Sequence, residues 1–233
     1  MGLCVGKLDI GRIIVIGLDG AGKTTLLYQA KSEPTANTIP TIGFNVEAIN
    51  IEGFGMLMWD LGGQSNLRSL WSHYMKDTNG IVFVVDAADP ERFSEAKKEL
   101  ENALNMQDLT GCRSFLILAN KQDIPGAVSA EQLAKTMDLE NLFASKTDEF
   151  SMEEISALPT PIEKNESPKF ERKFVRSFEP GAFCSWTVQP CCALTGKGIK
   201  EGLSWLVSNN HHRPKPKEKS KFSFKTEKPK VSS

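Results

Sequence analysis

The stretch Gly-Leu-Asp-Gly-Ala-Gly-Lys-Thr at residues 17–24 has the spacing G-x-x-x-x-G-K-[ST] of a phosphate-binding loop. Glycines at Gly17 and Gly22 allow a tight turn whose backbone N–H groups can converge on one anion at the start of the next helix. Lys23 supplies a positive charge for the β- and γ-phosphates, and the Thr24 hydroxyl is a hard oxygen ligand suited to Mg²⁺. The stretch therefore predicts a site for the phosphates of a nucleotide.

The residues on either side of this loop favour a particular fold. Residues 12–16 are a short β-branched run typical of a buried parallel strand, and residues 24–30 have the pattern of a helix. Further strand-like runs follow at 41–49, 54–59, 81–85, 115–118 and 186–189, with helical patterns between most of them. This alternation predicts an α/β fold, a doubly wound and mostly parallel sheet with helices on both faces. Right-handed crossovers bring the strand ends to one edge, where ligands are expected.

Composition divides the chain into this nucleotide-binding domain, at 12–144 and 185–210, and three additional segments. An N-terminal segment occupies residues 1–11. Residues 145–184 contain four prolines, many charges and no sustained period, which predicts a disordered surface insertion, either a solvated linker or a binding segment. Residues 211–233 carry eight Lys or Arg against two Glu and are expected to be a basic disordered tail. That tail is a solubilising segment, a patch for anionic lipid, or a nuclear-localisation or nucleic-acid arm.

The overall composition excludes several classes of protein. A net charge of −1 gives no general attraction to nucleic acid, and no nucleic-acid partner is expected. The five cysteines are odd in number and lack C-x-x-C spacing, which indicates reduced, intracellular usage. The sequence has no run of eighteen apolar residues and no secretory signal pattern. A cytoplasmic monomer is expected, with peripheral attachment to a Golgi, endosomal or plasma membrane left open.

Two further motifs carry chemistry. Asp60 ends a strand predicted to lie beside the strand of the phosphate loop, where a carboxylate holds Mg²⁺; a turn aspartate is the alternative. The stretch Asn-Lys-Gln-Asp at 120–123 ends another strand. Asp123 can accept two hydrogen bonds from adjacent N–H and NH₂ groups, an edge that guanine has and adenine lacks, and the Lys121 stem can lie along the purine face. A buried carboxylate rejects the wrong base strongly, because the acid is then left unpaired.

Together these motifs resemble those of the Ras-like small GTPases, specifically the ADP-ribosylation-factor-like branch. The matching segments, in order, are 17–25, 40–45 (Pro-Thr-Ile-Gly-Phe-Asn), 59–64 (Trp-Asp-Leu-Gly-Gly-Gln), 120–123 and 192–195 (Cys-Ala-Leu-Thr). The resemblance covers residues 12–144 and 186–208. It implies a small GTPase with GTP or GDP and Mg²⁺ as cofactors.

The resemblance also implies roles for individual residues. Gln64 orients the attacking water as the catalytic residue, and Thr24 and Thr41 are the metal ligands. The Gly63 N–H meets the γ-phosphate of GTP. The other implied nucleotide-binding residues are Gly17, Asp19, Gly20, Ala21, Gly22, Lys23, Thr25, Asn120, Lys121, Asp123, Cys192, Ala193 and Leu194.

The resemblance further implies protein partners. Phe44, Trp59 and Tyr74 match an exposed aromatic triad that binds effectors, although core packing is the alternative for Trp59 and Tyr74. An exchange factor and a GTPase-activating protein are expected as well. No arginine in the sequence is placed to act on the phosphates in cis, so intrinsic hydrolysis should be slow and an activating protein's arginine should raise it by about 10³–10⁵.

Membrane attachment depends on the two ends of the chain. Gly2 follows Met1 and Cys4 is close by, but Gly6 stands where the myristoylation pattern wants Ser or Thr. The segment is therefore either a lipidated anchor or a frayed terminus. One myristoyl chain binds membranes only marginally, at about 10⁴ M⁻¹, so Cys4 acylation or the basic tail would have to add a second signal.

Three functions compete at this point. The first is a GTP-binding switch with slow hydrolysis, regulating membrane traffic or membrane-associated signalling through effectors. The second is a scaffold that holds nucleotide permanently and acts through its insertion and tail. The third, an ATP-using kinase, is disfavoured by residues 120–123, whose acid would reject adenine.

Overall fold

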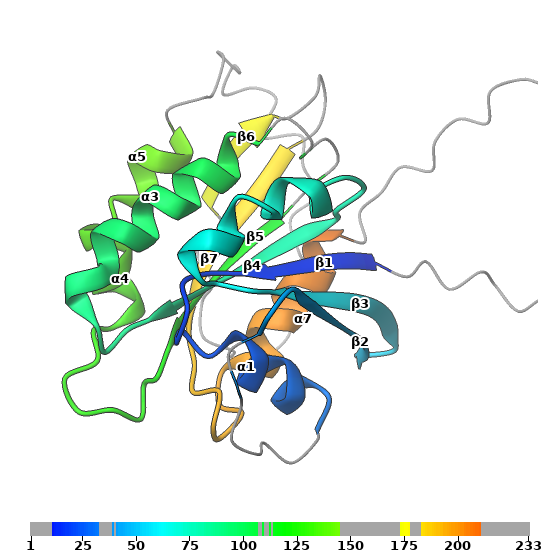
Figure 1. The fold of residues 1–233 in the computed structure, drawn as a ribbon, viewed down its shortest axis with the longest axis horizontal. Coiled ribbons are helices and arrows are strands. Elements are labelled where there is room, and N and C mark those ends of the chain that lie inside the picture. Colours follow the sequence, from blue (N-terminus) through cyan, green and yellow to red (C-terminus); the bar gives the residue numbers. More distant parts are fainter. Residues whose placement is uncertain are drawn as a thin grey trace, which may run out of the picture.

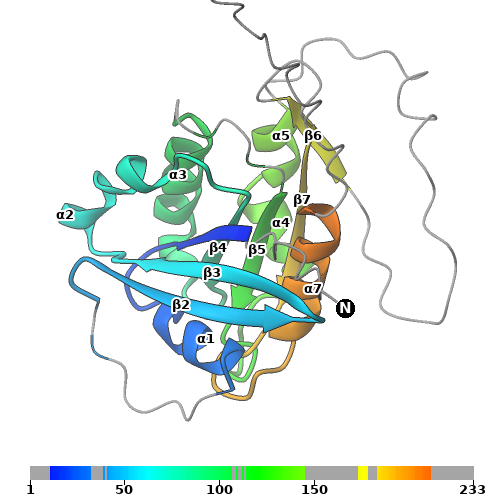
Figure 2. The same cartoon turned by 90° about the vertical axis from the view of Figure 1, so that its right-hand side faces the viewer.

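The computed structural model describes residues 11–32, 39, 41–106, 109, 112, 114–144, 173–177 and 183–210. These residues form a seven-stranded sheet with helices on both faces, in the order β2-β3-β1-β4-β5-β7-β6 (Figures 1 and 2). The strands are β1 (Gly11–Ile16), β2 (Phe44–Ile51), β3 (Phe54–Leu61), β4 (Gly80–Asp86), β5 (Ser114–Asn120), β6 (Lys173–Ser177) and β7 (Phe183–Pro190). The helices are α1 (Lys23–Ala30), α2 (Ser65–Arg68), α3 (Phe93–Leu104), α4 (Ala130–Thr136), α5 (Leu139–Ala144) and α7 (Ile199–Asn210). Short 3₁₀ turns lie at Trp71–Tyr74 and Pro90–Arg92.

The inner strands of the sheet are parallel. β1 pairs with β3 and β4, and β5 pairs with β4 and β7, all in parallel register. Among the described strands, the outermost pairs, β2 with β3 and β6 with β7, are antiparallel. The predicted doubly wound, mostly parallel α/β sheet is therefore confirmed.

The apolar run of β1 serves both faces of the sheet, because successive side chains of a strand point to opposite sides. Ile14 and Ile16 are buried in the cluster that includes residues of α3, α4 and α5. Ile13 and Val15 are buried in the cluster that includes residues of α1 and α7. Figure 1 shows these two groups of helices on opposite faces of the sheet. The two cores explain why these strands contain almost no polar residues.

Helix boundaries follow local chemistry. Ser129 and Gln132 form a capping box at the start of α4. That helix ends at Thr136, and Asp138 adopts a positive φ of 51° before α5 begins. Pro90 begins a 3₁₀ turn, and α3 proper starts at Phe93.

Part of the segment 145–184, which the sequence predicts to be a disordered insertion, forms the strand β6. β6 pairs with β7 along the edge of the sheet, and β7 begins at Phe183, two residues before the expected boundary. Such a strand is specified by backbone hydrogen bonds to a partner strand, which the composition of the segment does not reveal. The remainder of the insertion, residues 1–10 and the basic tail lie outside the described residues.

Within the described residues, no helix combines the length and the apolar character needed to cross a lipid bilayer.

Candidate functional site

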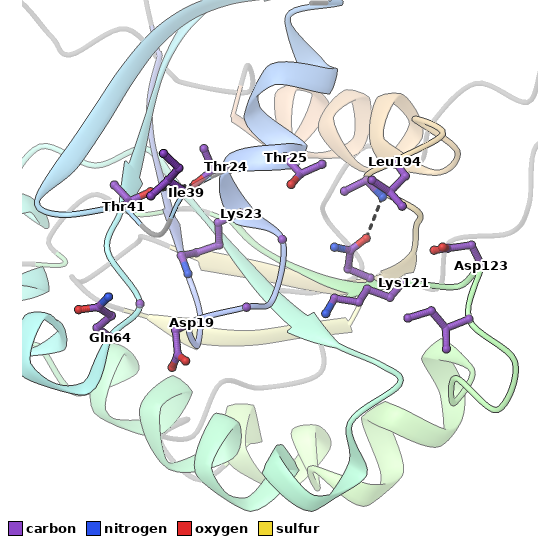
Figure 3. A pocket seen from close by; sticks show the side chains of 16 residues that line it. Asp19, Lys23, Thr24, Thr25, Ile39, Thr41, Gln64, Lys121, Asp123 and Leu194 are labelled. Atoms are coloured by element: carbon purple, nitrogen blue, oxygen red, sulfur yellow. Dashed lines mark hydrogen bonds between the residues drawn. The ribbon is translucent and has the colours of Figure 1, made fainter. Parts of the chain in front are cut away.

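A pocket of about 470 Å³ opens beyond the carboxyl ends of the parallel strands. The loops after β1, β3, β5 and β7 contribute to its lining, as expected for the ligand-binding edge of such a sheet. Figure 3 shows Thr24, Thr41 and Gln64 toward one end of the pocket, and Lys121, Asp123 and Leu194 toward the other. One end therefore carries hydroxyl and amino groups suited to phosphates, and the other carries an acid suited to a base.

The phosphate-binding loop requires glycine at two positions. Gly17 has φ 142°, and a Cβ there would lie 2.2 Å from the Val84 carbonyl oxygen. Gly22 has φ 95°, and a Cβ there would lie 2.4 Å from the Asn120 side-chain nitrogen. Both contacts are too close for any side chain, so the loop can pass this near to β4 and β5 only with glycine.

Lys23 lies at the first position of α1 and is almost fully buried. Its ammonium group donates a hydrogen bond of 2.8 Å to the Leu18 carbonyl within the loop. Burial lowers the pKa of Lys23 from its ordinary 10.5 to about 8, with the carboxylate of Asp60 acting in the opposite direction. The side chain is therefore a desolvated cation that would gain from a phosphate oxygen.

Three oxygen-bearing side chains meet beside Lys23. Thr24 Oγ1 donates to Asp60 Oδ2 at 2.6 Å, and Thr41 Oγ1 lies 2.9 Å from Thr24 Oγ1 and 3.3 Å from the same carboxylate oxygen. Asp60 is fully buried, and its Oδ1 has no partner within the described residues. Burial raises the pKa of Asp60, because the loss of solvation outweighs the hydrogen bonds from Thr24 and Thr41 and the charge of Lys23.

This arrangement fits a magnesium ion. Mg²⁺ takes oxygen ligands, keeps several waters, and uses one or two protein side chains together with phosphate oxygens. Among the described residues, no three His, Cys, Asp or Glu side chains are grouped so that they could hold a metal ion by themselves. Two hydroxyl groups are instead hydrogen-bonded to one buried carboxylate. Thr24 and Thr41 would hold the ion, and Asp60 would balance its charge.

Asn120 connects the phosphate-binding loop to the loop after β7 through two hydrogen bonds. Its side-chain nitrogen donates to the Ala21 carbonyl at 2.8 Å, and its oxygen accepts from the Ala193 N–H at 2.9 Å. The first bond reaches the phosphate-binding loop, and the second reaches the loop after β7. The residue therefore fixes the two loops relative to each other.

Asp123 and its surroundings form the wall of the base end. The Cys192 thiol donates to Asp123 Oδ1 at 3.1 Å, and the Lys121 ammonium pairs with Asp86 at the end of β4. Ile124 and Leu194 also line the pocket and are 42% and 64% exposed. Apolar side chains beside a carboxylate suit a flat aromatic base that must also be hydrogen-bonded.

Most of the predicted site residues line this one pocket. They are Asp19, Gly20, Gly22, Lys23, Thr24, Thr25, Thr41, Gly63, Gln64, Asn120, Lys121, Asp123, Ala193 and Leu194. Gly17, Ala21 and Cys192 do not line it but support it through the contacts described above. Ile39 and Ile124 line the pocket and were missed, because an isolated apolar residue in a loop has no distinguishing pattern.

The chain's similarity to known proteins agrees with this geometry. A sequence profile of the ADP-ribosylation factor family matches residues 5–161. ADP-ribosylation factor F of Dictyostelium discoideum is 39% identical over 206 residues, which cover 88% of this chain and 87% of that protein. This chain belongs to the ADP-ribosylation factor family. ADP-ribosylation factor K of the same organism is 37% identical over 89% of each chain.

A solved member of the wider group has a similar fold. It is the small GTPase Arl6 (BBS3) of Trypanosoma brucei, determined with the bound nucleotide analogue GppNp. It is 27% identical, with a TM-score of 0.64 over 86% of this chain and 96% of that one. The ADP-ribosylation factors are small GTPases, so this family member is a GTP-binding enzyme that hydrolyses GTP.

In this ADP-ribosylation factor family member the three predicted effector aromatics form one cluster. The ring centroid of Phe44 lies 5.4 Å from those of Trp59 and Tyr74, which are 6.1 Å apart. Phe44 is 49% exposed, whereas Trp59 and Tyr74 are half-buried and also pack against the core. The two interpretations from the sequence are therefore compatible, because the same rings support Phe44 and contact the interior.

Two arginines that the sequence did not single out bind the phosphate-binding loop from outside. Arg68 and Arg92 both contact the Asp19 carboxylate, at 3.1 and 2.9 Å, and Arg92 also donates to the Asp19 carbonyl. Hydrogen bonding to Arg92 lowers the pKa of Asp19. Neither arginine lines the pocket. Their signal in the sequence is weak, since a charge at a helix end is ordinarily solvated.

Proposed function

We propose that this family member is a GTP-dependent switch that hydrolyses GTP slowly and binds effectors in its GTP form, in membrane traffic or membrane-associated signalling. The observation that carries the proposal is a single pocket with two ends. Thr24, Thr41 and Asp60 converge at the phosphate end, and Asp123 lies at the base end. Such a pocket can sense both the identity of the base and the presence of a third phosphate.

Thr41 is the residue through which a third phosphate would act. It lies in the segment before β2, and its hydroxyl is hydrogen-bonded to that of Thr24, where the cation would bind. Loss of the γ-phosphate and weaker cation binding would release Thr41 and Gly63, the order-to-disorder change on which such switches depend. The exposed residues nearby, Ile42 at 88% and Phe44 at 49%, would change position with it.

Effectors would bind the surface formed by Phe44 with the switch segments, because aromatic residues contribute strongly to protein interfaces. The family implies an exchange factor and a GTPase-activating protein as further partners. Lipid on Gly2 or Cys4, together with the basic tail, would attach the protein to an anionic membrane. Mass spectrometry of the N-terminal peptide from cells tests for this lipid. If Gly2 and Cys4 are both unmodified, only the basic tail could attach the protein to the membrane.

The decisive experiment measures nucleotide binding and turnover by the purified full-length chain. GTP and GDP should bind in a Mg²⁺-dependent manner and ATP should compete only weakly; equal binding of ATP would refute the role of Asp123. In single-turnover assays, Gln64→Leu should hydrolyse GTP at least about tenfold more slowly than wild type. The matched variant Gln132→Leu, outside the pocket on α4, should keep the wild-type rate. A Gln64→Leu rate equal to wild type would favour a nucleotide-holding scaffold.

A further inference from the structure

Three consecutive peptide groups around Gly62 and Gly63 are each held by a hydrogen bond from a different part of the fold. The Gly62 N–H donates to the Gly43 carbonyl at 3.0 Å. The Gly62 carbonyl accepts from the indole N–H of Trp71 at 3.0 Å. The Gly63 carbonyl accepts from the backbone N–H of Asp19 at 3.2 Å. The backbone here is therefore fixed peptide by peptide rather than by a regular element.

The middle peptide of the three has a donor left over. The described chain contains no cis peptide bond, so the Gly62 C=O and the Gly63 N–H point in opposite directions. Because Trp71 binds the carbonyl from the core, the N–H faces the other way, toward the pocket that Gly63 lines. In the described part of the chain no group accepts this N–H. A Cβ at Gly63 would lie 2.4 Å from the Lys23 ammonium, so Gly63 itself lies beside that cation.

Arg68 fixes the following peptide. Its Nε donates to the Gly63 carbonyl at 2.7 Å, and the side chain is only 6% exposed. Its other nitrogens bind Glu95 at 2.7 Å and Glu99 at 3.3 Å on α3, and Asp19 at 3.1 Å. A guanidinium with all its edges engaged cannot rotate freely, so it holds the Gly63 carbonyl in one place.

The size of the buried Trp71 side chain does not by itself explain its hydrogen bond to the Gly62 carbonyl. Trp205 is also buried, on the other face of the sheet, and its indole nitrogen has no partner within the described residues. A buried tryptophan in this fold thus does not need a specific acceptor for its N–H. Trp71 nevertheless directs its N–H at the one carbonyl whose peptide carries the free Gly63 donor.

We propose that Trp71 and Arg68 are positioning residues that fix the Gly63 peptide groups, so that the Gly63 N–H is presented to the terminal phosphate of GTP. The inference rests on the proposed function and deepens it. GDP lacks the phosphate concerned, so the two residues should affect affinity for GTP and not affinity for GDP. A purely structural residue would affect both.

The test measures the ratio of affinities for GppNp and GDP in the full-length protein with Mg²⁺. Trp71→Phe keeps an aromatic ring in the core and removes only the donor and part of the volume. We expect it to lower the ratio by about 3- to 10-fold, the effect of one net hydrogen bond, with the GDP affinity within about twofold of wild type. Trp205→Phe is the matched control, because it removes the same atoms from the other core, and it should leave the ratio unchanged.

Arg68→Lys provides a second, independent arm. Lysine keeps the charge but cannot bind Gly63, Asp19 and the α3 carboxylates together, so the ratio should fall by about 3- to 10-fold here too. Its matched control is Arg12→Lys, which removes a hydrogen bond to the Tyr74 carbonyl between two residues that do not line the pocket. Should Trp71→Phe fail to give a cooperative thermal transition, the Arg68→Lys ratio decides.

The outcomes separate the inference from the function beneath it. A wild-type protein that binds neither GDP nor GppNp would refute the proposed function. A wild-type protein that binds both, with variant ratios equal to the wild-type ratio, would overturn the positioning roles alone. An equal loss of GDP and GppNp affinity in the variants would overturn them as well, because it would indicate a structural role.

Discussion

The backbone N–H of Ala193 donates a hydrogen bond of 2.9 Å to the side-chain oxygen of Asn120. The amide nitrogen of the same side chain donates to the Ala21 carbonyl. One buried residue therefore holds the loop after β7 and the phosphate-binding loop together. Nucleotide binding requires the two ends of the pocket at a fixed separation. This relationship therefore links pocket geometry to nucleotide retention.

We expect Asn120→Ala to release GDP at least about tenfold faster than wild type. The substitution leaves the Ala21 carbonyl and the Ala193 N–H buried without a partner, at about 1–3 kcal/mol for each group. Stopped-flow release of a fluorescent GDP analogue measures the effect. The control is Ser129→Ala, which removes the capping box of α4 and costs about 1 kcal/mol of stability away from the pocket. Equal release rates in the two variants would mean that destabilisation alone explains the change.

Asp123→Asn should change the base preference of the protein from guanine to xanthine. The carboxylate of Asp123 accepts hydrogen bonds, whereas an amide also donates and so suits the carbonyl that xanthine has in place of the guanine amino group. Loss of a charge-assisted hydrogen bond should weaken GTP binding by at least about tenfold. Competition by GTP, XTP and ATP measures the preference. Cys192→Ala removes only the thiol that bonds to the same carboxylate and should keep the guanine preference.

Asp60→Asn should weaken Mg²⁺ binding by about 10- to 100-fold. Asp60 holds the hydroxyls of both predicted metal ligands, and removal of such supporting groups typically costs this much. The measurement is the Mg²⁺ concentration that halves the rate of GDP release, with chelation by EDTA giving the metal-free rate. Glu47→Gln removes a carboxylate from β2 outside the pocket and serves as the control. If both variants need the same Mg²⁺ concentration as wild type, Asp60 does not support the ion.

Nucleotide affinity should fall as pH rises above about 8. The Lys23 ammonium has a pKa of about 8 in the free protein, and only its protonated form attracts phosphate oxygens. Affinity should therefore decrease by up to about tenfold per pH unit until the pKa of the complex is reached. The Lys23→Arg variant stays charged throughout and should lack the part of the pH dependence that comes from Lys23. Titration of the nucleotide's guanine base affects wild type and variant alike. Parallel pH profiles for wild type and variant would contradict the assignment.

The stability of the free protein should change in the opposite direction. Between pH 8 and 10.5 the unfolded chain binds a proton at Lys23 that the folded protein has already lost. The free energy of unfolding should consequently rise across this window, because the unfavourable burial of the cation disappears. Thermal unfolding of nucleotide-free protein against pH checks the direction, with Lys23→Arg as the reference.

Much of the site could be predicted because its motifs depend on local chemistry. Gly17 and Gly22 are required by backbone conformation within a few residues of each other, and Lys23 follows at once. Asp60 and Asp123 each end or follow a buried strand, a position that hydrophobic patterning reveals. By contrast, Ile39 and Ile124 have no such pattern, and only the folded pocket identifies them.

The sequence by itself determined the alternation of strands and helices, the phosphate-binding turn and the position of the acid that is proposed to select the base. All of these follow from spacing, burial and backbone freedom over short stretches. The tertiary structure alone decided which distant groups meet: β6 with β7, Asn120 with Ala21, and Trp71 with Gly62. Hydrogen bonds of this kind join segments brought together only by the packed sheet, so they leave no periodic trace in the order of residues.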